Sequence, residues 1–147
     1  MNIPLYAFKS LAYGPEGQTL FLNANNSGAV TVQYSAAPTS EWALFYVPEL
    51  AAVMIINSAS GQALTALDDN RTVKTSSDLK PSDHNTWTFS AAEPGPAIRS
   101  RYNPDLNLNI NGTTYPEGTH VIVYKWDGER NSRWEPVPVS SALATTA

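Results

Sequence analysis

The chain alternates short apolar and β-branched runs with turn residues, and no long segment has helical periodicity. Runs such as 29–34, 42–47 and 120–124 have the length and composition of strands. Gly-Pro, Ser-Gly, Asn-Gly and Asp-Gly pairs separate such runs, and the 8 Gly and 11 Pro leave little room for a helix. Residues 50–56 are ambiguous by period, but their β-branched end favours a strand. The pattern predicts an all-β protein.

Three copies of one unit organise the chain. The tryptophans that close the copies are 45 and 47 residues apart: Trp42, Trp87 and Trp134. The leucines that precede them are 44 residues apart: Leu20, Leu64 and Leu108. The sequence GAVTVQY at 28–34 also matches GTHVIVY at 118–124. Closure about a pseudo-threefold axis lets each copy cover its neighbours and removes most sheet edges, so we expect a β-trefoil.

The β-trefoil prediction fixes the expected organisation of the 147 residues. We expect a single domain over 1–139, made of three repeats of four short strands at about 5–48, 49–92 and 93–139. The small polar residues at 140–147 predict a flexible tail. The three repeat tryptophans are expected to lie in the core.

Composition narrows the kind of partner. Asn, Ser and Thr fill 39 of 147 positions while only 15% of residues are charged, which suits neutral polar ligands. The net charge is −4, and the nine Lys and Arg are scattered, so nucleic acid is excluded as a partner. The absence of Cys, of a signal-like apolar segment and of any apolar run beyond seven residues predicts a cytoplasmic protein without membrane insertion.

The third repeat carries a family resemblance. The segments LNI at 108–110, GTHV at 118–121, YKWD at 124–127 and NSRW at 131–134 follow one another in that order. This order resembles the repeat of ricin-B-like (R-type) lectins, and the second repeat resembles their cysteine-free cytosolic fungal members. The resemblance covers residues 6–137 and implies binding of galactose or N-acetylgalactosamine, with Tyr124 and Asn131 in the site.

The sequence also departs from the family pattern. The Gln expected two residues before each closing Trp is replaced by Ser40, Asn85 and Ser132. The acidic residue expected on the first strand of a sugar site is replaced by Phe21, Thr65 and Asn109 in our alignment of the repeats. These replacements leave the fold intact and bear on the sugar specificity.

Sugar recognition needs one aromatic platform and several polar groups that point the same way. The third repeat supplies these within a short span, and its candidate carbohydrate-binding residues are Asn109, Gly112, His120, Tyr124, Trp126, Asp127 and Asn131. The first repeat offers a second candidate site: Asn23, Asn25, Gly28 and Tyr34. The second repeat has no aromatic at the corresponding position and has His84 in place of Asn131, so its site is expected to be lost or to take a different ligand.

Structural roles are open for the same residues. Tyr124 could pack in the core, and strand alternation could bury Trp126. Asp127 could cap its own turn, and Asn109 could bond to local backbone. If Asn131 instead serves the ligand alone, replacing it by Ala is expected to abolish binding and leave the thermal midpoint nearly unchanged.

The sequence contains no catalytic motif, and we expect neither an enzyme nor a cofactor or metal site. His84 and His120 lie in different repeats, and Asp68-Asp69-Asn70 is interpreted as a turn because the remainder of a calcium loop is missing.

We therefore predict a lectin that binds glycans of glycoproteins or glycolipids. A single shallow sugar site has a dissociation constant on the order of 1 mM, roughly −4 kcal/mol, so a second site or a homodimer would be needed for useful avidity. The family resemblance further implies haemagglutination and a role in defence. The alternative is a β-trefoil protease inhibitor that presents an exposed loop, either 67–72 with Arg71 or 78–84 with Lys80. A third interpretation is a protein-interaction trefoil in which all sugar sites are lost.

Overall fold

The computed structural model describes residues 3–90 and 96–139. The expected flexible tail at 140–147 and the expected boundary between the second and third repeats at 92–93 lie outside the described residues. The described part is all-β, which confirms the predicted fold class. Within it, the helical elements are three single 3-10 turns, and none is long and apolar enough to cross a membrane.

Each repeat contributes four strands. Those of the first repeat are β1 (Leu5–Tyr13), β2 (Thr19–Ala24), β3 (Val30–Gln33) and β4 (Trp42–Val47). Those of the second repeat are β5 (Ala52–Asn57), β6 (Ala63–Ala66), β7 (Val73–Ser76) and β8 (Trp87–Phe89). Those of the third repeat are β9 (Ile98–Ser100), β10 (Leu106–Ile110), β11 (Val121–Lys125) and β12 (Trp134–Pro138). The 3-10 turns are η1 (Pro38–Ser40), η2 (Pro48–Leu50) and η3 (Arg130–Ser132).

The ambiguous segment at 50–56 is mostly strand, as favoured by its β-branched end. Strand β5 begins at Ala52, while the apolar run starts in η2, which ends in a left-handed Ala51 with φ of 50°.

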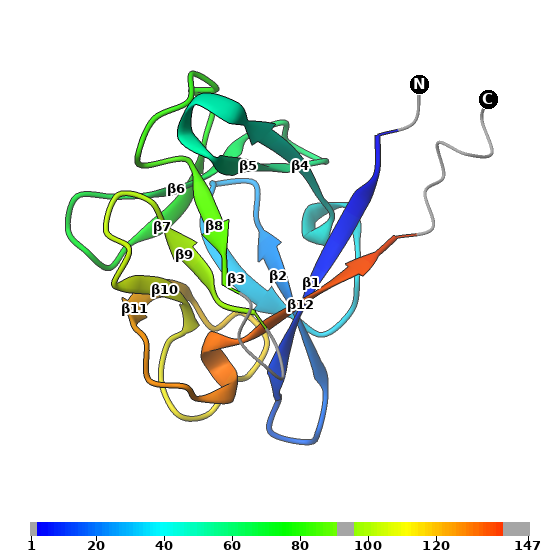
Figure 1. Ribbon diagram of the computed structural model, residues 1–147. Coiled ribbons are helices and arrows are strands. Elements are labelled where there is room, and N and C mark those ends of the chain that lie inside the picture. Colours follow the sequence, from blue (N-terminus) through cyan, green and yellow to red (C-terminus); the bar gives the residue numbers. More distant parts are fainter. Residues whose placement is uncertain (1–2, 91–95, 140–147) are drawn as a thin grey trace.

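Six strands form a ring in the order β12–β1–β4–β5–β8–β9, each antiparallel to the next. The backbone N–H of Trp134 in β12 donates to the carbonyl of Pro96 just before β9, at 3.0 Å, and closes the ring. Figure 1 shows β1 and β12, from the first and last repeats, lying side by side. Their pairing brings the start of the chain next to the third repeat.

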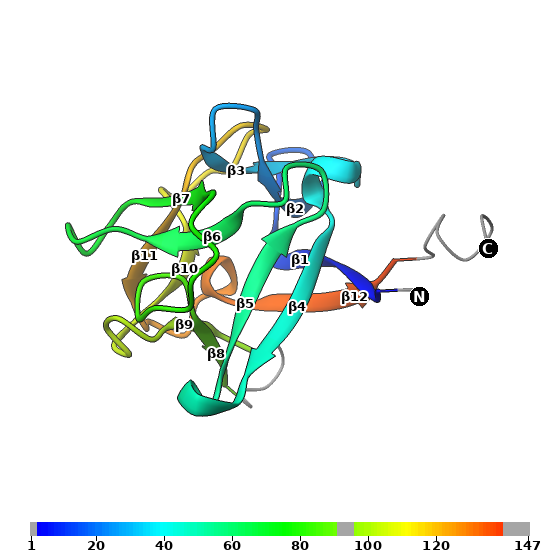
Figure 2. The same ribbon diagram turned by 90° about the horizontal axis from the view of Figure 1, so that it is seen from above.

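The other six strands form three hairpins, β2–β3, β6–β7 and β10–β11, which close one end of the ring. Each hairpin is bridged to the next by a backbone pair: Ala29 with Lys74, Thr72 with Ile122, and Thr31 with His120. In Figure 2 the β6–β7 and β10–β11 hairpins are seen beside each other. Residues at the tip of one repeat's hairpin therefore reach the surface of another repeat.

The three repeat tryptophans are fully buried, as expected, and each makes the same hydrogen bond. The indole Nε1 atoms of Trp42, Trp87 and Trp134 donate to the backbone carbonyls of Leu22, Leu64 and Leu108 at 3.1, 2.9 and 3.1 Å, respectively. The three equivalent bonds show the pseudo-threefold symmetry directly.

These bonds correct our alignment of the first repeat. Leu22, and not Leu20, is equivalent to Leu108, so Asn23 stands at the position of Asn109. The pairing of Gln33 with Phe21 is then equivalent to the pairing of Tyr124 with Asn107. The sequence match failed because the β2–β3 loop, residues 25–29, is shorter than the β10–β11 loop, residues 111–120. Tyr34 is therefore not the counterpart of Tyr124.

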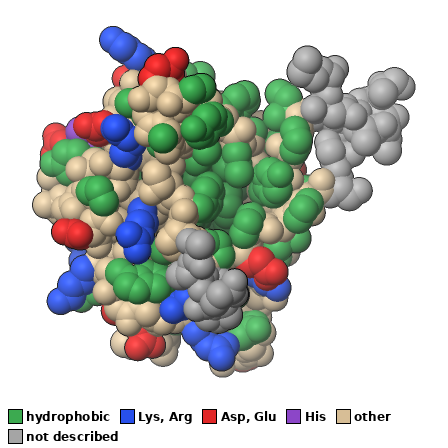
Figure 3. Space-filling model, in the orientation of Figure 1, with side chains coloured by type: hydrophobic (Ala, Val, Ile, Leu, Met, Phe, Trp, Pro, Cys, Tyr) green, Lys and Arg blue, Asp and Glu red, His purple; other side chains and the backbone are tan. Residues whose placement is uncertain are grey.

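Charged side chains are dispersed over the surface. On the face drawn in Figure 3, Lys and Arg are interspersed with Asp and Glu, and that face carries no basic stripe.

Candidate functional site

A cavity of about 300 Å³ lies on the third repeat and is named here the third-repeat cavity. Five of the seven residues predicted for the main sugar site line it: Asn109, Gly112, Tyr124, Asp127 and Asn131. Its remaining wall is formed by Asn111, Thr113, Ile122 and, from the second repeat, Arg71. The cavity lies at the lower end of the size range typical of small-molecule sites, roughly 300 to 1,000 Å³.

Asn131 is nearly buried and is held by the strand beneath it. Its Nδ2 donates to the carbonyl of Ile110 at 2.9 Å and approaches Oδ1 of Asn109 at 3.4 Å. Within the described part of the chain, no hydrogen bond occupies Oδ1 of Asn131. The side-chain nitrogen of Asn131 thus supports the fold, and its oxygen is left as an acceptor at the cavity.

Both polar atoms of the buried Asn109 side chain already take part in hydrogen bonds. Its Nδ2 donates to Oγ of Ser132 at 2.8 Å, and its Oδ1 faces the Asn131 amide. Ser132 in turn donates to Oδ1 of Asp127 at 3.1 Å. Ser132, which replaces the expected Gln of the closing motif, therefore connects the strand to Asp127. Asn109 thus links the side chains of Asn131 and Ser132 at the wall of the cavity.

Asp127 caps its turn and still has one free oxygen. Its Oδ1 accepts from the Glu129 N–H at 2.9 Å as well as from Ser132. Among the described residues no hydrogen bond reaches Oδ2. The two oxygens of the Asp127 carboxylate thus differ: Oδ1 caps the turn, and Oδ2 is left for the ligand contact predicted from the sequence. The free oxygen can accept hydroxyl protons.

Tyr124 supplies the aromatic surface of the cavity. Its side chain is 41% exposed, so it does not pack in the core. Ile122 lies two residues earlier on the same face of β11, is nearly buried and forms an apolar floor next to Asn109. Gly112 has a φ of 98°, which favours glycine in the turn after β10. Together they give the cavity one apolar wall and one polar wall.

Arg71 is a functional candidate that the sequence analysis did not place here. It follows the β6 strand, and its guanidinium donates to Oδ1 of Asn111 at 3.2 Å at the edge of the third-repeat cavity. Its backbone carbonyl accepts from the N–H of Val123 in β11 at 2.9 Å. No local pattern indicates this contact, because it arises from hairpins that are bridged in the folded chain.

Two predicted residues of the third repeat lie outside the cavity. His120 lines a hollow of about 220 Å³ on the β6–β7 side, which shares Arg71, Asn111 and Ile122 with the third-repeat cavity. Trp126 lines another hollow with Arg99 and Asp105. The guanidinium carbon of Arg133 lies 4.8 Å from the centroid of the Trp126 ring. Arg133 thus lies over one face of the Trp126 ring, and Trp126 and Tyr124 line different hollows.

The four residues predicted for the first-repeat site serve mainly the fold. Asn25 accepts three hydrogen bonds within its own turn, and Tyr34 is half-buried against the core. Gly28 lies against the second repeat, where its carbonyl accepts from the N–H of Thr75 at 2.9 Å. Asn23 is buried, and its Oδ1 has no partner among the described residues. None of the four lines any of the cavities described above.

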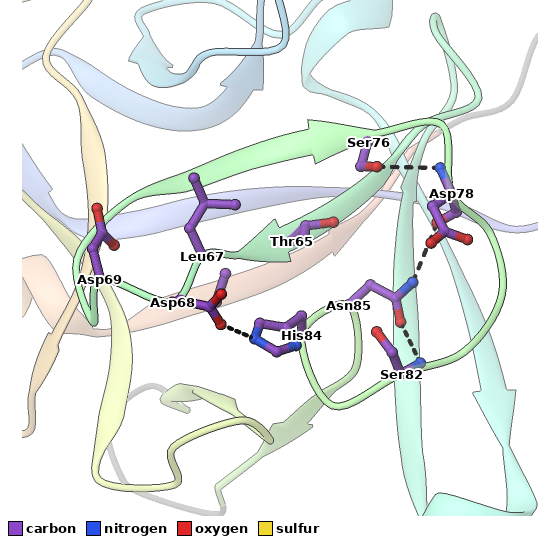
Figure 4. A pocket seen from close by; sticks show the side chains of 10 residues that line it. Thr65, Leu67, Asp68, Asp69, Ser76, Asp78, Ser82, His84 and Asn85 are labelled. Carbon is purple, nitrogen blue, oxygen red and sulfur yellow. Dashed lines mark hydrogen bonds and ion pairs between the residues drawn. The ribbon is translucent and has the colours of Figure 1, made fainter.

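The second repeat carries a larger hollow, the second-repeat cavity, of about 600 Å³ (Figure 4). Figure 4 shows Asp68 facing His84, with Oδ1 of Asp68 2.7 Å from Nε2 of His84. The amide group of Asn85 is fully engaged: it donates to the carbonyls of Asp78 and Lys80 and accepts from the N–H of Ser82. Among the described residues that line this cavity there is no Phe, Tyr or Trp. Its larger volume therefore does not make it the better sugar site.

Among residues 3–90 and 96–139, the acidic and histidine side chains are the potential ligands for a metal ion. There, no group of three or more His, Cys, Asp or Glu side chains is arranged to hold a metal ion. The Asp68-Asp69-Asn70 segment is a turn, as interpreted from the sequence: Asp69 accepts from the N–H groups of Arg71 and Thr72, and Asn70 has a φ of 57°.

Comparison with known proteins identifies the fold alone. No family model and no curated protein matches the chain. Among solved structures, the Rhizoctonia solani agglutinin is 21% identical with a TM-score of 0.77, covering 95% of this chain and 97% of that chain. The designed threefold-symmetric protein ThreeFoil is 20% identical with a TM-score of 0.77, covering 92% and 99%.

A third structure is the earthworm R-type lectin C-half in complex with GalNAc. It is 14% identical with a TM-score of 0.68, covering 92% of this chain and 99% of that chain. Some matches are much longer proteins, and this chain spans 17% of the chain of a mosquitocidal holotoxin.

Proposed function

We propose that the chain is a carbohydrate-binding lectin and not an enzyme, and that its third-repeat cavity binds a terminal galactose or N-acetylgalactosamine unit. The observation that carries the proposal is the meeting of three groups in one cavity: the exposed ring of Tyr124, the free oxygen of Asp127 and the free oxygen of Asn131. A pyranose presents one apolar C–H face and a rim of hydroxyl groups, which match an aromatic wall opposite two acceptors.

The wider setting supports the proposal. The fold is shared with the Rhizoctonia solani agglutinin and with an earthworm lectin solved with GalNAc. The third repeat also has the segment order of R-type lectin repeats, and its aromatic and Asn residues fall in the cavity. A single cavity of this size predicts weak binding, so glycan display at high density is the suitable assay.

The trypsin-inhibitor alternative loses support at its main residue. Arg71 bonds to Asn111 beside the third-repeat cavity, whereas a residue that enters a protease pocket must project free of its own protein. At the other loop, Pro81 stands directly after Lys80, the residue that would have to enter the protease pocket. We therefore do not propose protease inhibition.

A glycan array probed with the purified protein tests the proposal, together with one isosteric variant in each cavity. Asp127→Asn keeps an acceptor toward Ser132 but turns the free oxygen into a donor, so we expect array binding to fall at least tenfold. Asp78→Asn makes the same change in the second-repeat cavity and is expected to leave binding unchanged.

Two outcomes would overturn the proposal. Absence of binding to every galactose-terminated or N-acetylgalactosamine-terminated glycan would refute the sugar specificity. Loss of binding in Asp78→Asn with full binding in Asp127→Asn would move the site to the second repeat. Tyr124→Ala gives an independent check, because loss of the aromatic wall is expected to weaken binding without affecting the buried core.

A further inference from the structure

A second hollow adjoins the third-repeat cavity. It has a volume of about 600 Å³ and is named here the Tyr13 cavity. Its lining includes four residues that also line the third-repeat cavity: Gly112, Thr113, Asp127 and Asn131. The two cavities are therefore adjacent, with these four residues at their common boundary.

Tyr13 gives this cavity an aromatic surface of its own. Its side chain is 55% exposed at the end of β1, and among the described residues no hydrogen bond or ring contact engages it. Its position is fixed from the main chain: the N–H of Leu11 donates to the carbonyl of Arg133 at 3.1 Å, which ties β1 to the segment after Asn131. The ring thus comes from the first repeat but stands at the third-repeat site.

The polar lining of the Tyr13 cavity suits uncharged hydroxyl groups. Asp127 and Glu129 place two carboxylates there against the single guanidinium of Arg130, so the balance disfavours an anionic ligand. Tyr115 forms part of the wall, and its pKa is raised by burial and by the nearby Asp127 and Glu129. Its phenol therefore stays neutral at physiological pH and can donate or accept.

We propose that the Tyr13 cavity binds a second, neutral sugar unit, so that the protein selects a disaccharide or longer glycan over a single sugar. The inference rests on the proposed sugar binding by the third-repeat cavity. The first unit contacts Tyr124, Asp127 and Asn131, and the next unit lies against the ring of Tyr13. Asp127 stands between the two units and limits the linkages that can cross it.

Calorimetric titration tests the inference with defined probes. The probes are methyl glycosides of galactose and N-acetylgalactosamine, neutral disaccharides that contain either sugar in different linkages, and the sialylated forms of those disaccharides. At least one neutral disaccharide is expected to bind tenfold or more tightly than its methyl glycoside, a difference of about 1.4 kcal/mol. Sialic acid placed on the second unit is expected to remove this gain.

Variants at Tyr13 assign the gain to the cavity. Tyr13→Ala is expected to lose most of the disaccharide gain while methyl glycoside affinity stays within twofold, and Tyr13→Phe to retain the gain. Tyr46→Ala is the matched control, because Tyr46 is 64% exposed on β4 and lines neither cavity.

The failure of this inference can be told apart from the failure of the proposed function. Methyl glycoside binding without a gain for any disaccharide would refute the Tyr13 cavity and leave the sugar site standing. The proposed role of the Tyr13 cavity would also be refuted if the Tyr13→Ala variant still bound the disaccharide more tightly than the methyl glycoside. Absence of binding to every probe would overturn both proposals.

Discussion

The side chain of Asn131 donates to the backbone carbonyl of Ile110 at 2.9 Å, from a position that is only 8% exposed. Asn131, which the family resemblance assigns to the sugar site, therefore also links η3 to the end of β10. The expectation that Asn131→Ala would leave stability nearly unchanged needs revision on this ground. The proposed ligand contact and a hydrogen bond that supports the fold therefore belong to the same side chain.

For Asn131→Ala we expect a loss of about 1 to 3 kcal/mol in the free energy of unfolding, because the Ile110 carbonyl is left buried without its partner. Sugar binding is expected to be lost as well. Urea denaturation of the variant and the parent measures the first effect, and the glycan array measures the second. Unchanged stability would contradict this structural role of Asn131.

Arg71→Ala removes a side chain that crosses from the second repeat to the third. Because only the bond to Asn111 is lost and the backbone pairing stays, we expect the thermal midpoint to change little. Sugar affinity is expected to fall several-fold as one wall of the cavity is lost. The same protein samples should be assayed against trypsin: stoichiometric inhibition by the parent that disappears in the variant would revive the inhibitor alternative.

Replacing Gly28 or Gly17 by Ala tests how closely one repeat packs against another, with Gly17 as the control. Both have positive φ, 88° and 83°, so an Ala at either position is strained by roughly 1 to 2 kcal/mol. A Cβ on Gly28 would lie 3.2 Å from the carbonyl oxygen of Thr75, whereas a Cβ on Gly17 would meet nothing within 4 Å. We expect Gly28→Ala to lower the thermal midpoint more than Gly17→Ala, and equal losses would contradict the close approach of the hairpins.

The turn that Asp69 stabilises, next to Arg71, is expected to lose stability in acid. Hydrogen bonds from the Thr72 side chain and from the N–H groups of Thr72 and Arg71 lower the pKa of Asp69 below its ordinary value of 3.8. The folded form therefore favours the carboxylate. Its contribution to stability is complete above pH 3.8 and is lost as the pH falls through the lowered pKa.

Carboxyl chemical shifts of Asp69 across an acid titration, with amide exchange of Arg71 and Thr72, follow this loss directly. Asp69→Asn keeps the acceptor oxygen and removes the titration, so it should show no such step in amide exchange. An Asp69 that titrates at or above 3.8 would refute the expected protection.

The sequence by itself determined the fold. Trp42, Trp87 and Trp134 mark the repeats because each fills an equivalent place in the core and donates to the equivalent strand of its own repeat, β2, β6 or β10. That role is local to each repeat, so the same residue type recurs once in every repeat. For the same reason, Tyr124, Asp127 and Asn131 could be assigned to one site, since all three lie within a short stretch around one hairpin and its closing turn.

Only the tertiary structure decided which residues share a cavity. The unequal hairpin loops hid the equivalence of Asn23 with Asn109 and misplaced Tyr34. Trp126 lines a different hollow from Tyr124 and Asp127, although these residues are its neighbours in sequence. Arg71 and Tyr13 reach the third repeat from elsewhere in the chain, through bridged hairpins and through the pairing of β1 with β12. Such contacts follow from how the ring of strands closes, and closure brings together residues that periodicity within one repeat does not relate.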